Sequence, residues 1–328
     1  MSTRAVIEGI GHSVPDRVLT NDDLMKMVDT TDEWIVQRTG IRERRISSPE
    51  ETTSVLSIRA AKKAMAMADA DPGEIELVIC GTVTGDMPFP STSCLIQEGI
   101  GAKGAGAFDV GAACAGFIYA LSVAGAMIEG GQAKTILVVG ADTLTKFVDW
   151  TDRSTCVLFG DGAAAVVVRA RQNTDRGLVK TVLLADGEGA KHIDLQVGGS
   201  LHPVSDPASA SCRSTIYMAG AEVYRFAVNA MGDACCRALE LAGMDSTDVD
   251  LFVPHQANLR IIESAKARLG LPDEKVFINV ERFGNTSGAS IPIGLSEAVA
   301  QGRLKPGMLV MTVGFGAGLV WGANLIRW

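Results

Sequence analysis

Three side chains of the types that combine in nucleophilic catalysis each follow an apolar run of the sequence. Cys114 comes after the run AFDV and opens an apolar helical pattern. His255, one of only four histidines, directly follows LFVP, and Asn285 lies in the loop GNTSGAS after VFINV. In α/β proteins the ends of strands are where functional groups gather. A cysteine thiolate in this setting would be a nucleophile that an imidazole and an amide could assist.

Each of these residues also has an ordinary structural interpretation. Free cysteine is commonly a small buried hydrophobe, a histidine can be a satisfied core residue, and asparagine is frequent in turns. The position of Cys114 at a helix N-terminus favours its thiolate, because unpaired N–H groups and the helix dipole stabilise negative charge. The functional interpretation gains weight because all three side chains are expected at one place in the fold.

Composition excludes several classes of protein. The chain has 328 residues, a net charge of −8 and no basic run, which argues against a general nucleic-acid binder. The start, MSTRAVIEGIGH, lacks the apolar core of a signal peptide. Seven cysteines without metal-like spacing indicate free thiols in a reducing cytosol and no metal site. The uncharged stretch 110–128 is long enough to span a membrane, but its glycine and alanine content favours a buried central helix. We expect a cytoplasmic protein.

Alternating strand and helix patterns predict an α/β fold. We expect strands at 6–10, 75–80, 107–110, 135–139, 163–168, 251–253 and 276–280. We expect the longer helices at 52–69, 93–100, 114–129, 223–241 and 259–269. The segment 186–214 carries glycine, serine and proline and is predicted to be a long surface excursion.

An internal repeat links the two halves of the chain at an offset of about 174 residues. IELVI at 75–79 matches VDLFV at 249–253, and ILVVG at 136–140 matches VMTVG at 310–314. The preceding helix and acidic turn match in the same register, which favours duplication over chance. The repeat predicts two similar halves, 1–172 with the cysteine and 173–328 with the histidine and asparagine. A functional site is expected where the halves meet.

Eight motifs occur along the chain in the order TTDEWIVQRTGIRERRI, FDVGAACAGF, TDRST, FGDGAAA, MAGAEVYRFAV, VPHQANLRII, GNTSGAS and GFGAGLVWG. With these motifs in this order, the chain resembles the 3-oxoacyl-[acyl-carrier-protein] synthase III family, the initiating condensing enzymes of dissociated fatty-acid synthesis. The resemblance covers essentially the whole length. It implies a thiolase-like, five-layered αβαβα fold made of two duplicated halves, with central buried helices and a homodimer.

The resemblance implies a two-step reaction. Cys114 would take an acyl group from an acyl-CoA, most simply acetyl-CoA, and the enolate from decarboxylation of malonyl carrier protein would then attack it. His255 and Asn285 would donate hydrogen bonds to the enolate oxygen. Backbone N–H groups of Cys114 and Ala317 would form the oxyanion hole, although relatives often have glycine at the second position. Coenzyme A enters as a substrate, so no cofactor is expected.

Two related subclasses fit less well. A thiolase carries a late second cysteine, and none occurs after Cys236. An elongating synthase carries a second histidine where Asn285 stands. The cysteine, histidine and asparagine set therefore resembles the initiating class.

Binding residues carry over by position from the same resemblance. Trp34 and Arg153 would sandwich the coenzyme A adenine through stacking and cation–π contacts, and Arg38 would contact the phosphates. Gly220 and Asn258 would line the tunnel for the pantetheine arm. Phe315 would line the acyl pocket, and Phe89 would cap the acyl pocket of a partner subunit. Acidic carrier protein needs a local basic patch, for which the candidates are Arg225, Arg260, Lys266 and Arg268.

Three alternatives to this function remain open from the sequence. A synthase of the same family could use another acceptor, as in alkylquinolone or polyketide-priming enzymes. A hydrolase with cysteine, histidine and asparagine would cleave thioesters or peptides without forming a carbon–carbon bond. A catalytically silent binding protein would have an unreactive Cys114.

Overall fold

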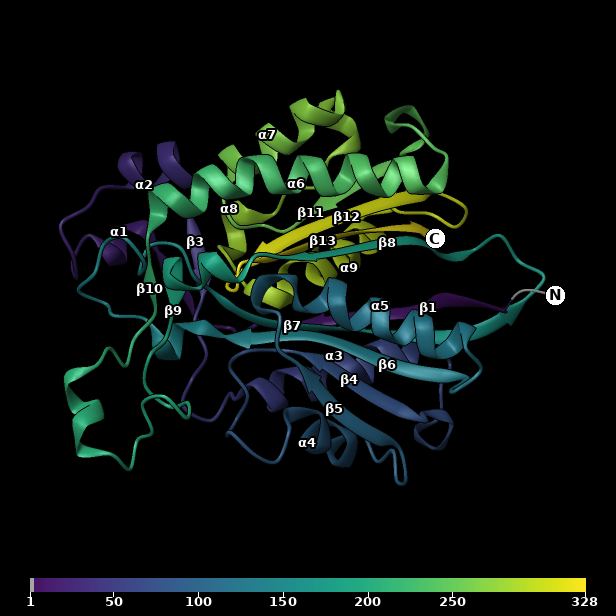
Figure 1. Ribbon diagram of the computed structural model, residues 1–328, viewed down its shortest axis with the longest axis horizontal. Coiled ribbons are helices and arrows are strands. Elements are labelled where there is room, and N and C mark those ends of the chain that lie inside the picture. The colour runs from purple at the N-terminus through teal and green to yellow at the C-terminus, as the bar shows by residue number, and fades with distance from the viewer. Residues whose placement is uncertain (1–2) are drawn as a thin grey trace.

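The computed structural model describes residues 3–328, and it contains two β-sheets that separate three layers of helices (Figure 1). The first sheet has the order β1-β7-β6-β4-β5, with strands Thr3–Ser13, Asp161–Gln172, Thr135–Thr143, Leu77–Gly81 and Gly106–Val110. The second has the order β11-β12-β13-β8, with strands Leu251–Pro254, Leu309–Gly316, Val320–Arg327 and Gly177–Ala185. Every residue of β6 is buried, as expected for a strand covered on both faces.

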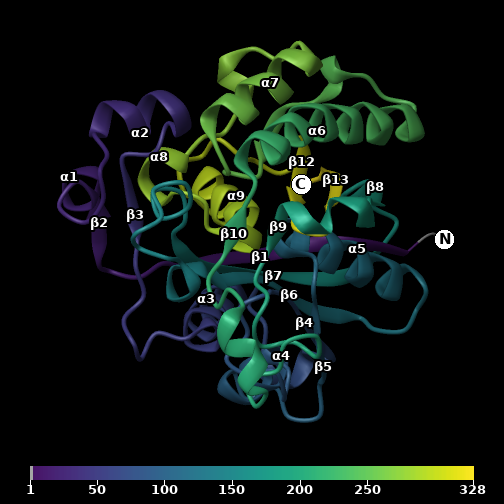
Figure 2. The same cartoon turned by 60° about the vertical axis from the view of Figure 1, so that its left-hand side comes forward.

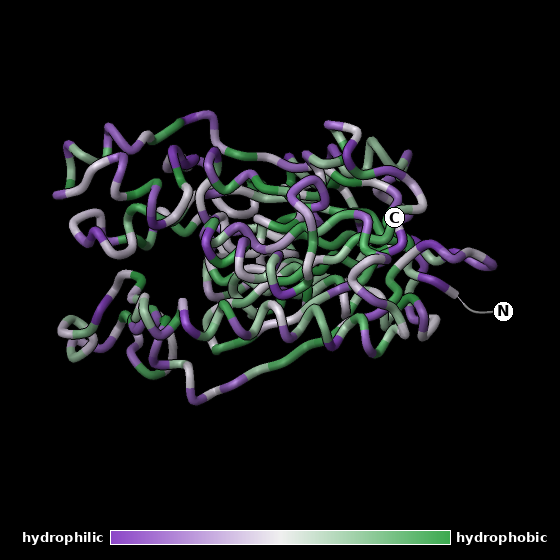
Figure 3. The backbone as a smooth tube through the Cα atoms, turned by 90° about the horizontal axis from the view of Figure 1, so that it is seen from above, coloured by the Kyte–Doolittle hydropathy of each residue, from purple (hydrophilic) through white to green (hydrophobic). Residues whose placement is uncertain are grey.

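Helices occupy the outer faces of both sheets and the space between them. Helices α3 (Thr53–Met67) and α4 (Thr92–Gly99) cover the first sheet, and α6 (Gly220–Ala242) and α7 (Leu259–Leu269) lie on the opposite side of the molecule (Figure 1). Helices α5 (Gly116–Glu129) and α9 (Ser290–Ala300) lie between the sheets. The apolar segments lie toward the centre and polar loops toward the outside (Figure 3). The predicted five-layered αβαβα fold is confirmed.

Smaller elements stand to one side of the sheets. Short helices α1 (Asn21–Leu24) and α2 (Asp32–Thr39) flank the two-stranded sheet of β2 (Val18–Thr20) and β3 (Glu43–Arg45), next to α8 (Val280–Phe283) (Figure 2). A second small sheet pairs β9 (Ile193–Asp194) with β10 (Tyr217–Met218). These elements extend the edge of the molecule at which the predicted site residues lie.

The structure repeats itself at the offset found in the sequence. Strands β4 and β11, helices α5 and α9, and the single turns Ala113–Ala115 and Ser287–Ala289 each recur about 174 residues apart. Even an uncommon backbone conformation is duplicated, because Ala113 and Ser287 have φ of +43° and +51°. The β-strands up to residue 172 belong to the first sheet or to the small β2–β3 sheet, and β8 begins at Gly177 in the second.

The predicted strand at 276–280 is wrong. Val276 makes only an isolated parallel bridge with Phe252, and helix α8 begins at Val280. The reason is the buried side chain of Gln256, whose Oε1 accepts the N–H groups of Asn279 and Val280 at 3.0 and 3.2 Å. Its Nε2 donates to the carbonyl of Phe277 at 3.1 Å. A side chain thus satisfies the backbone groups that a neighbouring strand would otherwise have paired.

The uncharged stretch around α5 belongs to the interior, as the sequence predicted. Helix α5 has 14 residues, and eight of them, from Gly116 to Ile128, are buried between the two sheets. Within residues 3–328, no helix combines the length and the low polarity that crossing a bilayer requires.

Arg44 is a fully buried charge that joins β3 to the rest of the fold. Its guanidinium donates to the carbonyls of Leu19 and Val157 at 3.1 and 2.8 Å and to Asn21 Oδ1 at 2.9 Å. Burial lowers the pKa of Arg44 to about 10, which leaves the side chain charged at neutral pH. The position is fixed by three acceptors drawn from two segments, residues 19–21 and Val157.

We expect Arg44→Met to lower the free energy of unfolding by about 2–4 kcal/mol, because buried acceptors lose a charged donor. Urea unfolding followed by circular dichroism measures the change. Arg59→Met is the control, since Arg59 is half exposed and pairs only with Glu51 at the surface. Equal stability of the two variants would contradict the importance given to the buried guanidinium.

Candidate active site

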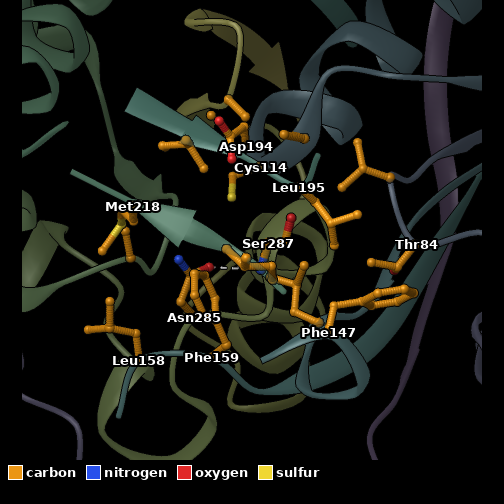
Figure 4. A pocket seen from close by; sticks show the side chains of 18 of the residues that line it. Thr84, Cys114, Phe147, Leu158, Phe159, Asp194, Leu195, Met218, Asn285 and Ser287 are labelled. Atoms are coloured by element: carbon orange, nitrogen blue, oxygen red, sulfur yellow. Dashed lines mark hydrogen bonds between the residues drawn. The ribbon is translucent and has the colours of Figure 1, made fainter. Parts of the chain in front are cut away.

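A pocket of about 660 Å³ brings the three predicted side chains together at the junction of the halves. Cys114, His255 and Asn285 all line it, and Phe315 and Ala317 line it beside them. Cys114 comes from the first half, and the other four residues come from the second. Figure 4 shows Cys114 and Asn285 facing the same space, with apolar side chains around them.

Cys114 occupies the turn between β5 and α5, where the backbone of the second half comes close to that of the first. A side chain at Gly316, at the end of β12, would come within 2.6 Å of Cys114 N, so only glycine fits there. The close approach carries Ala317, which follows Gly316, to the pocket. The backbone of the second half therefore lies directly beside the backbone N–H of Cys114.

The helix N-terminus, which favours a thiolate at Cys114, is opposed by desolvation of the thiol. Burial raises the pKa of the thiol to about 12, and the carboxyl of Asp142 adds to the shift. The side chains of Ser287 and Asn285 oppose it in part. Desolvation of the negative charge outweighs the helix N-terminus in the protein without substrate. The thiol is neutral at rest, and its proton must leave during the reaction.

This pKa makes a prediction for chemical labelling. The thiolate is the reactive form, so alkylation of Cys114 by iodoacetamide should rise about tenfold per pH unit from pH 7 to pH 10. An unfolded cysteine with a pKa of about 8.5 would level off within that range. Mass spectrometry of the Cys114 peptide at a series of pH values measures the rate. A plateau below pH 9 would contradict the buried neutral thiol.

His255 is held at the end of β11 by both backbone and side-chain contacts. Its backbone N–H donates to the carbonyl of Val313 at 2.7 Å, and its ring Nδ1 lies 2.6 Å from Ser290 Oγ. The ring meets Phe315 edge-on, with centroids 5.6 Å apart. Burial lowers the pKa of His255 to about 3, so the imidazole is neutral at physiological pH. A neutral imidazole can donate one hydrogen bond into the pocket.

Asn285 is placed by the loop that follows α8. Its backbone N–H donates to the carbonyl of Leu158 at 2.8 Å, and its backbone carbonyl accepts the N–H of Gly160 at 3.0 Å. Its Oδ1 accepts the N–H of Ser287 at 2.8 Å, the dashed line in Figure 4. Because the amide oxygen is engaged within the loop, Nδ2 is the atom left to donate toward the pocket.

Asp142, which the sequence analysis did not single out, lies behind the cysteine at the same junction. Its Oδ1 accepts hydrogen bonds from the side chains of Thr82 and Thr84 at 3.0 and 2.8 Å, and its Oδ2 accepts Gly288 N at 3.2 Å. Burial raises its pKa. Its carboxyl ties the end of β6 to the GNTSGAS loop. Its place two residues after the repeated ILVVG motif is the signal that could have found it.

Comparisons with known proteins agree with this geometry. Sequence profiles described as 3-oxoacyl-[acyl-carrier-protein (ACP)] synthase III and as its C-terminal part match residues 108–187 and 239–328. Beta-ketoacyl-[acyl-carrier-protein] synthase III of Symbiobacterium thermophilum is 51% identical, over 98% of this chain and 97% of its own length. The chain belongs to the 3-oxoacyl-[acyl-carrier-protein] synthase III family.

Solved structures of this synthase III family share the fold. The Aquifex aeolicus VF5 enzyme has a TM-score of 0.91 and 46% identity, over 99% of this chain and 100% of that one. A priming β-ketosynthase from the R1128 polyketide biosynthetic pathway has a TM-score of 0.92 and 38% identity, over 99% and 96%. The predicted family, fold and condensing-enzyme class are confirmed.

Three of the five residues expected to bind coenzyme A, namely Trp34, Arg38 and Arg153, form a cluster outside the pocket lining. The guanidinium groups of Arg38 and Arg153 lie 4.7 and 4.8 Å from the ring centroid of Trp34. Arg153 also donates to the carbonyl of Asp29 at 2.8 Å. Asn258 lines the pocket, and its Nδ2 donates to the carbonyl of Arg38 at 2.9 Å. Asn258 thus links this cluster to the pocket, which Gly220 also lines.

The four basic residues predicted for carrier docking differ in whether acidic side chains of this chain already pair with them. Lys266 pairs with Glu263 and, at 2.6 Å, with Asp273, and these partners raise its pKa. Arg268 pairs with Asp233 at 3.0 Å. Arg260 is exposed and stacks on Tyr224 at 5.0 Å, and Arg225 is exposed on α6. Arg225 and Arg260 therefore have the charge least compensated by neighbours.

The excursion 186–214 has a function that sequence reasoning did not find. Six of its residues line the pocket, namely Ile193, Asp194, Leu195, Val197, Gly198 and Gly199. An ion pair between Arg213 and Asp194, at 2.8 Å, joins the two arms of the excursion. The segment forms one wall of the pocket. Within residues 3–328, no cluster of side chains is suited to hold a metal ion.

Proposed function

We propose that this chain starts fatty-acid synthesis by transferring an acyl group from acyl-CoA to Cys114 and condensing it with malonyl carrier protein. The observation that carries the proposal is one pocket that holds Cys114, His255 and Asn285 from the two halves of a synthase III chain. Their geometry supports a nucleophile next to two neutral hydrogen-bond donors, an arrangement suited to an anionic enolate.

In the first step, Cys114 sulfur attacks the thioester carbonyl, and the bond to coenzyme A sulfur breaks. The thiol proton leaves with the coenzyme A thiolate, so the acyl-enzyme is neutral. Negative charge develops on the carbonyl oxygen, where we place the backbone N–H groups of Cys114 and Ala317. The close packing of Gly316 against Cys114 N supports this oxyanion hole.

In the second step, the carbon–carbon bond to the malonyl carboxylate breaks and carbon dioxide leaves. The electron pair remains as an enolate, which His255 and Asn285 stabilise through donated hydrogen bonds. The enolate carbon attacks the acyl group, and Cys114 leaves as a thiolate, which takes a proton from water to restore the resting thiol. Decarboxylation supplies the carbanion, so no strong base is needed, which is consistent with the low pKa of His255.

We propose further that Trp34, Arg38 and Arg153 hold the nucleotide end of coenzyme A, while Gly220 and Asn258 line the path of its pantetheine arm. A cation–π cluster at the surface suits an adenine and its phosphates. Carrier protein would dock on α6 and α7, with Arg225 and Arg260 as the main contacts and Lys266 and Arg268 beside them.

The active form in this proposal is a cytoplasmic homodimer with Phe89 as a cap on the partner's acyl pocket. Phe89, Leu201 and Val204 are 84%, 82% and 81% exposed. Large apolar side chains this exposed favour a protein interface. Phe315, 5% exposed, would line the acyl pocket of its own subunit. All seven cysteines are free, which fits a reducing compartment.

Intact-protein mass spectrometry tests the function. The protein would be mixed with acetyl-CoA and then with malonyl carrier protein, the acylated residue mapped and the carrier product weighed. We expect acetyl on Cys114 followed by an acetoacetyl carrier protein. Acylation without a new carbon–carbon bond would contradict the condensing role. No label from any acyl-CoA would contradict the nucleophile.

A second candidate is priming of polyketide synthesis, which the similarity to the R1128 priming ketosynthase favours. The same two steps would then begin from a different acyl group or end on a different carrier protein. Competition between acetyl-CoA and longer or branched acyl-CoAs separates the two candidates. A strong preference for the longer substrates would favour the priming role.

A further inference from the structure

Ser290, the first residue of α9, contacts the histidine of the pocket. Its Oγ lies 2.6 Å from His255 Nδ1 and accepts the N–H of Gln256 at 3.3 Å. Ser290 is 2% exposed and His255 1% exposed, so water cannot readily replace either partner. The hydroxyl therefore joins the imidazole to the backbone that follows β11.

The direction of this hydrogen bond follows from the atoms available. A serine hydroxyl has one hydrogen and two acceptor lone pairs. The N–H of Gln256 takes one lone pair, and within residues 3–328 the Ser290 hydroxyl has no other contact than His255 Nδ1 to receive its hydrogen. If Nδ1 carried a proton, this buried hydrogen would be left without an acceptor, which is unfavourable. Nδ1 therefore accepts the hydrogen bond, and the ring proton lies on Nε2.

The other ring nitrogen belongs to the reaction pocket. His255 lines the pocket, and its Nε2 is buried without a hydrogen-bond partner in the described part of the chain. The ring of Phe315 packs edge-on against the imidazole and so restricts its rotation. A buried donor that the protein leaves unpaired inside a pocket is available to a ligand.

We propose that Ser290 is a positioning residue that holds His255 in the tautomer with an Nε2–H donor aimed at the enolate oxygen. This inference rests on the donor role given to His255 in the proposed function. Without the hydroxyl, both tautomers become accessible. In the tautomer with a bare Nε2, the lone pair of Nε2 would face a lone pair of the enolate oxygen, and the enolate would be destabilised.

Helix α9 contains a matched control for this contact. Ser296 Oγ lies 2.8 Å from Nδ1 of His12, which makes a second serine–histidine pair on the same helix. Ser296 is 8% exposed, and neither it nor His12 lines the pocket. Loss of the Ser296 hydroxyl therefore removes a similar hydrogen bond without touching the reaction pocket.

The tautomer can be read directly in the unaltered protein. Nitrogen-15 NMR of the protein labelled at its four histidines distinguishes a protonated from a bare ring nitrogen, and a His255→Gln variant assigns the signals. At pH 7 we expect His255 with protonated Nε2 and bare Nδ1. A protonated Nδ1 would overturn the role of Ser290, and this result does not depend on the folding of any variant.

Kinetics of the separate steps complete the test. In Ser290→Ala we expect condensation to slow by about 10–100-fold, the range found for outer partners of metal-bound imidazoles, with acylation of Cys114 and KM for malonyl carrier protein unchanged. Ser290→Thr should restore the rate, and Ser296→Ala should leave it unaltered. Equal loss in both alanine variants would overturn the proposal. If His255→Gln still condensed although the wild-type ring carries a proton on Nε2, the proposed role of His255 in condensation would be contradicted. The tautomer assignment would still hold, but the Nε2–H donor would have no role in condensation.

Discussion

Replacing Cys114 by alanine is expected to abolish acyl transfer, with a loss on the order of 10⁴-fold or more, because the covalent intermediate cannot form. The fold should persist, since alanine fits the space of the thiol. Mass spectrometry after mixing with acetyl-CoA should show an unmodified protein. Circular dichroism should match that of the wild type.

The chain supplies its own control for this experiment. Cys236 is exposed on α6, away from the pocket lining, next to the buried Cys235. Cys236→Ala should be acylated and should condense like the wild type. If Cys114→Ala still formed the 3-oxoacyl product, the nucleophile would have to be sought elsewhere.

Asn285→Asp is expected to reduce condensation by about 10²–10³-fold while acylation of Cys114 continues. The new carboxylate can still accept the N–H of Ser287 through an oxygen, so the loop should keep its conformation. The change removes the Nδ2 donor and places negative charge beside the oxygen of the enolate. The selective loss therefore has an electrostatic cause.

Two separate assays measure the two steps of this variant. Release of coenzyme A reports acylation, and release of carbon dioxide from malonyl carrier protein reports decarboxylation. Gln132→Glu, an exposed change away from the pocket lining and from α6 and α7, controls for the added charge. Equal damage to both steps in Asn285→Asp would show that the residue does not act selectively on the enolate.

Sequence patterns predicted the architecture because strands and helices that repeat at a fixed offset impose their own symmetry. The run IELVI and its match VDLFV located β4 and β11, and the run ILVVG and its match VMTVG located β6 and β12. The pattern failed at 276–280, where five residues look like a strand. Gln256 lies far enough away in sequence that its capture of Asn279 and Val280 could not be read locally.

Residue types and motif order, which need no coordinates, were enough to determine the family, the two-halved fold and the three residues that meet in the pocket. Tertiary structure alone decided the state of those residues. The pKa of the Cys114 thiol is raised by desolvation in the folded chain, and His255 receives its partner from Ser290, 35 positions further along the chain. The excursion likewise becomes a pocket wall only when the chain folds back. Charge and proton placement depend on desolvation and on partners distant in sequence, which local patterns do not record.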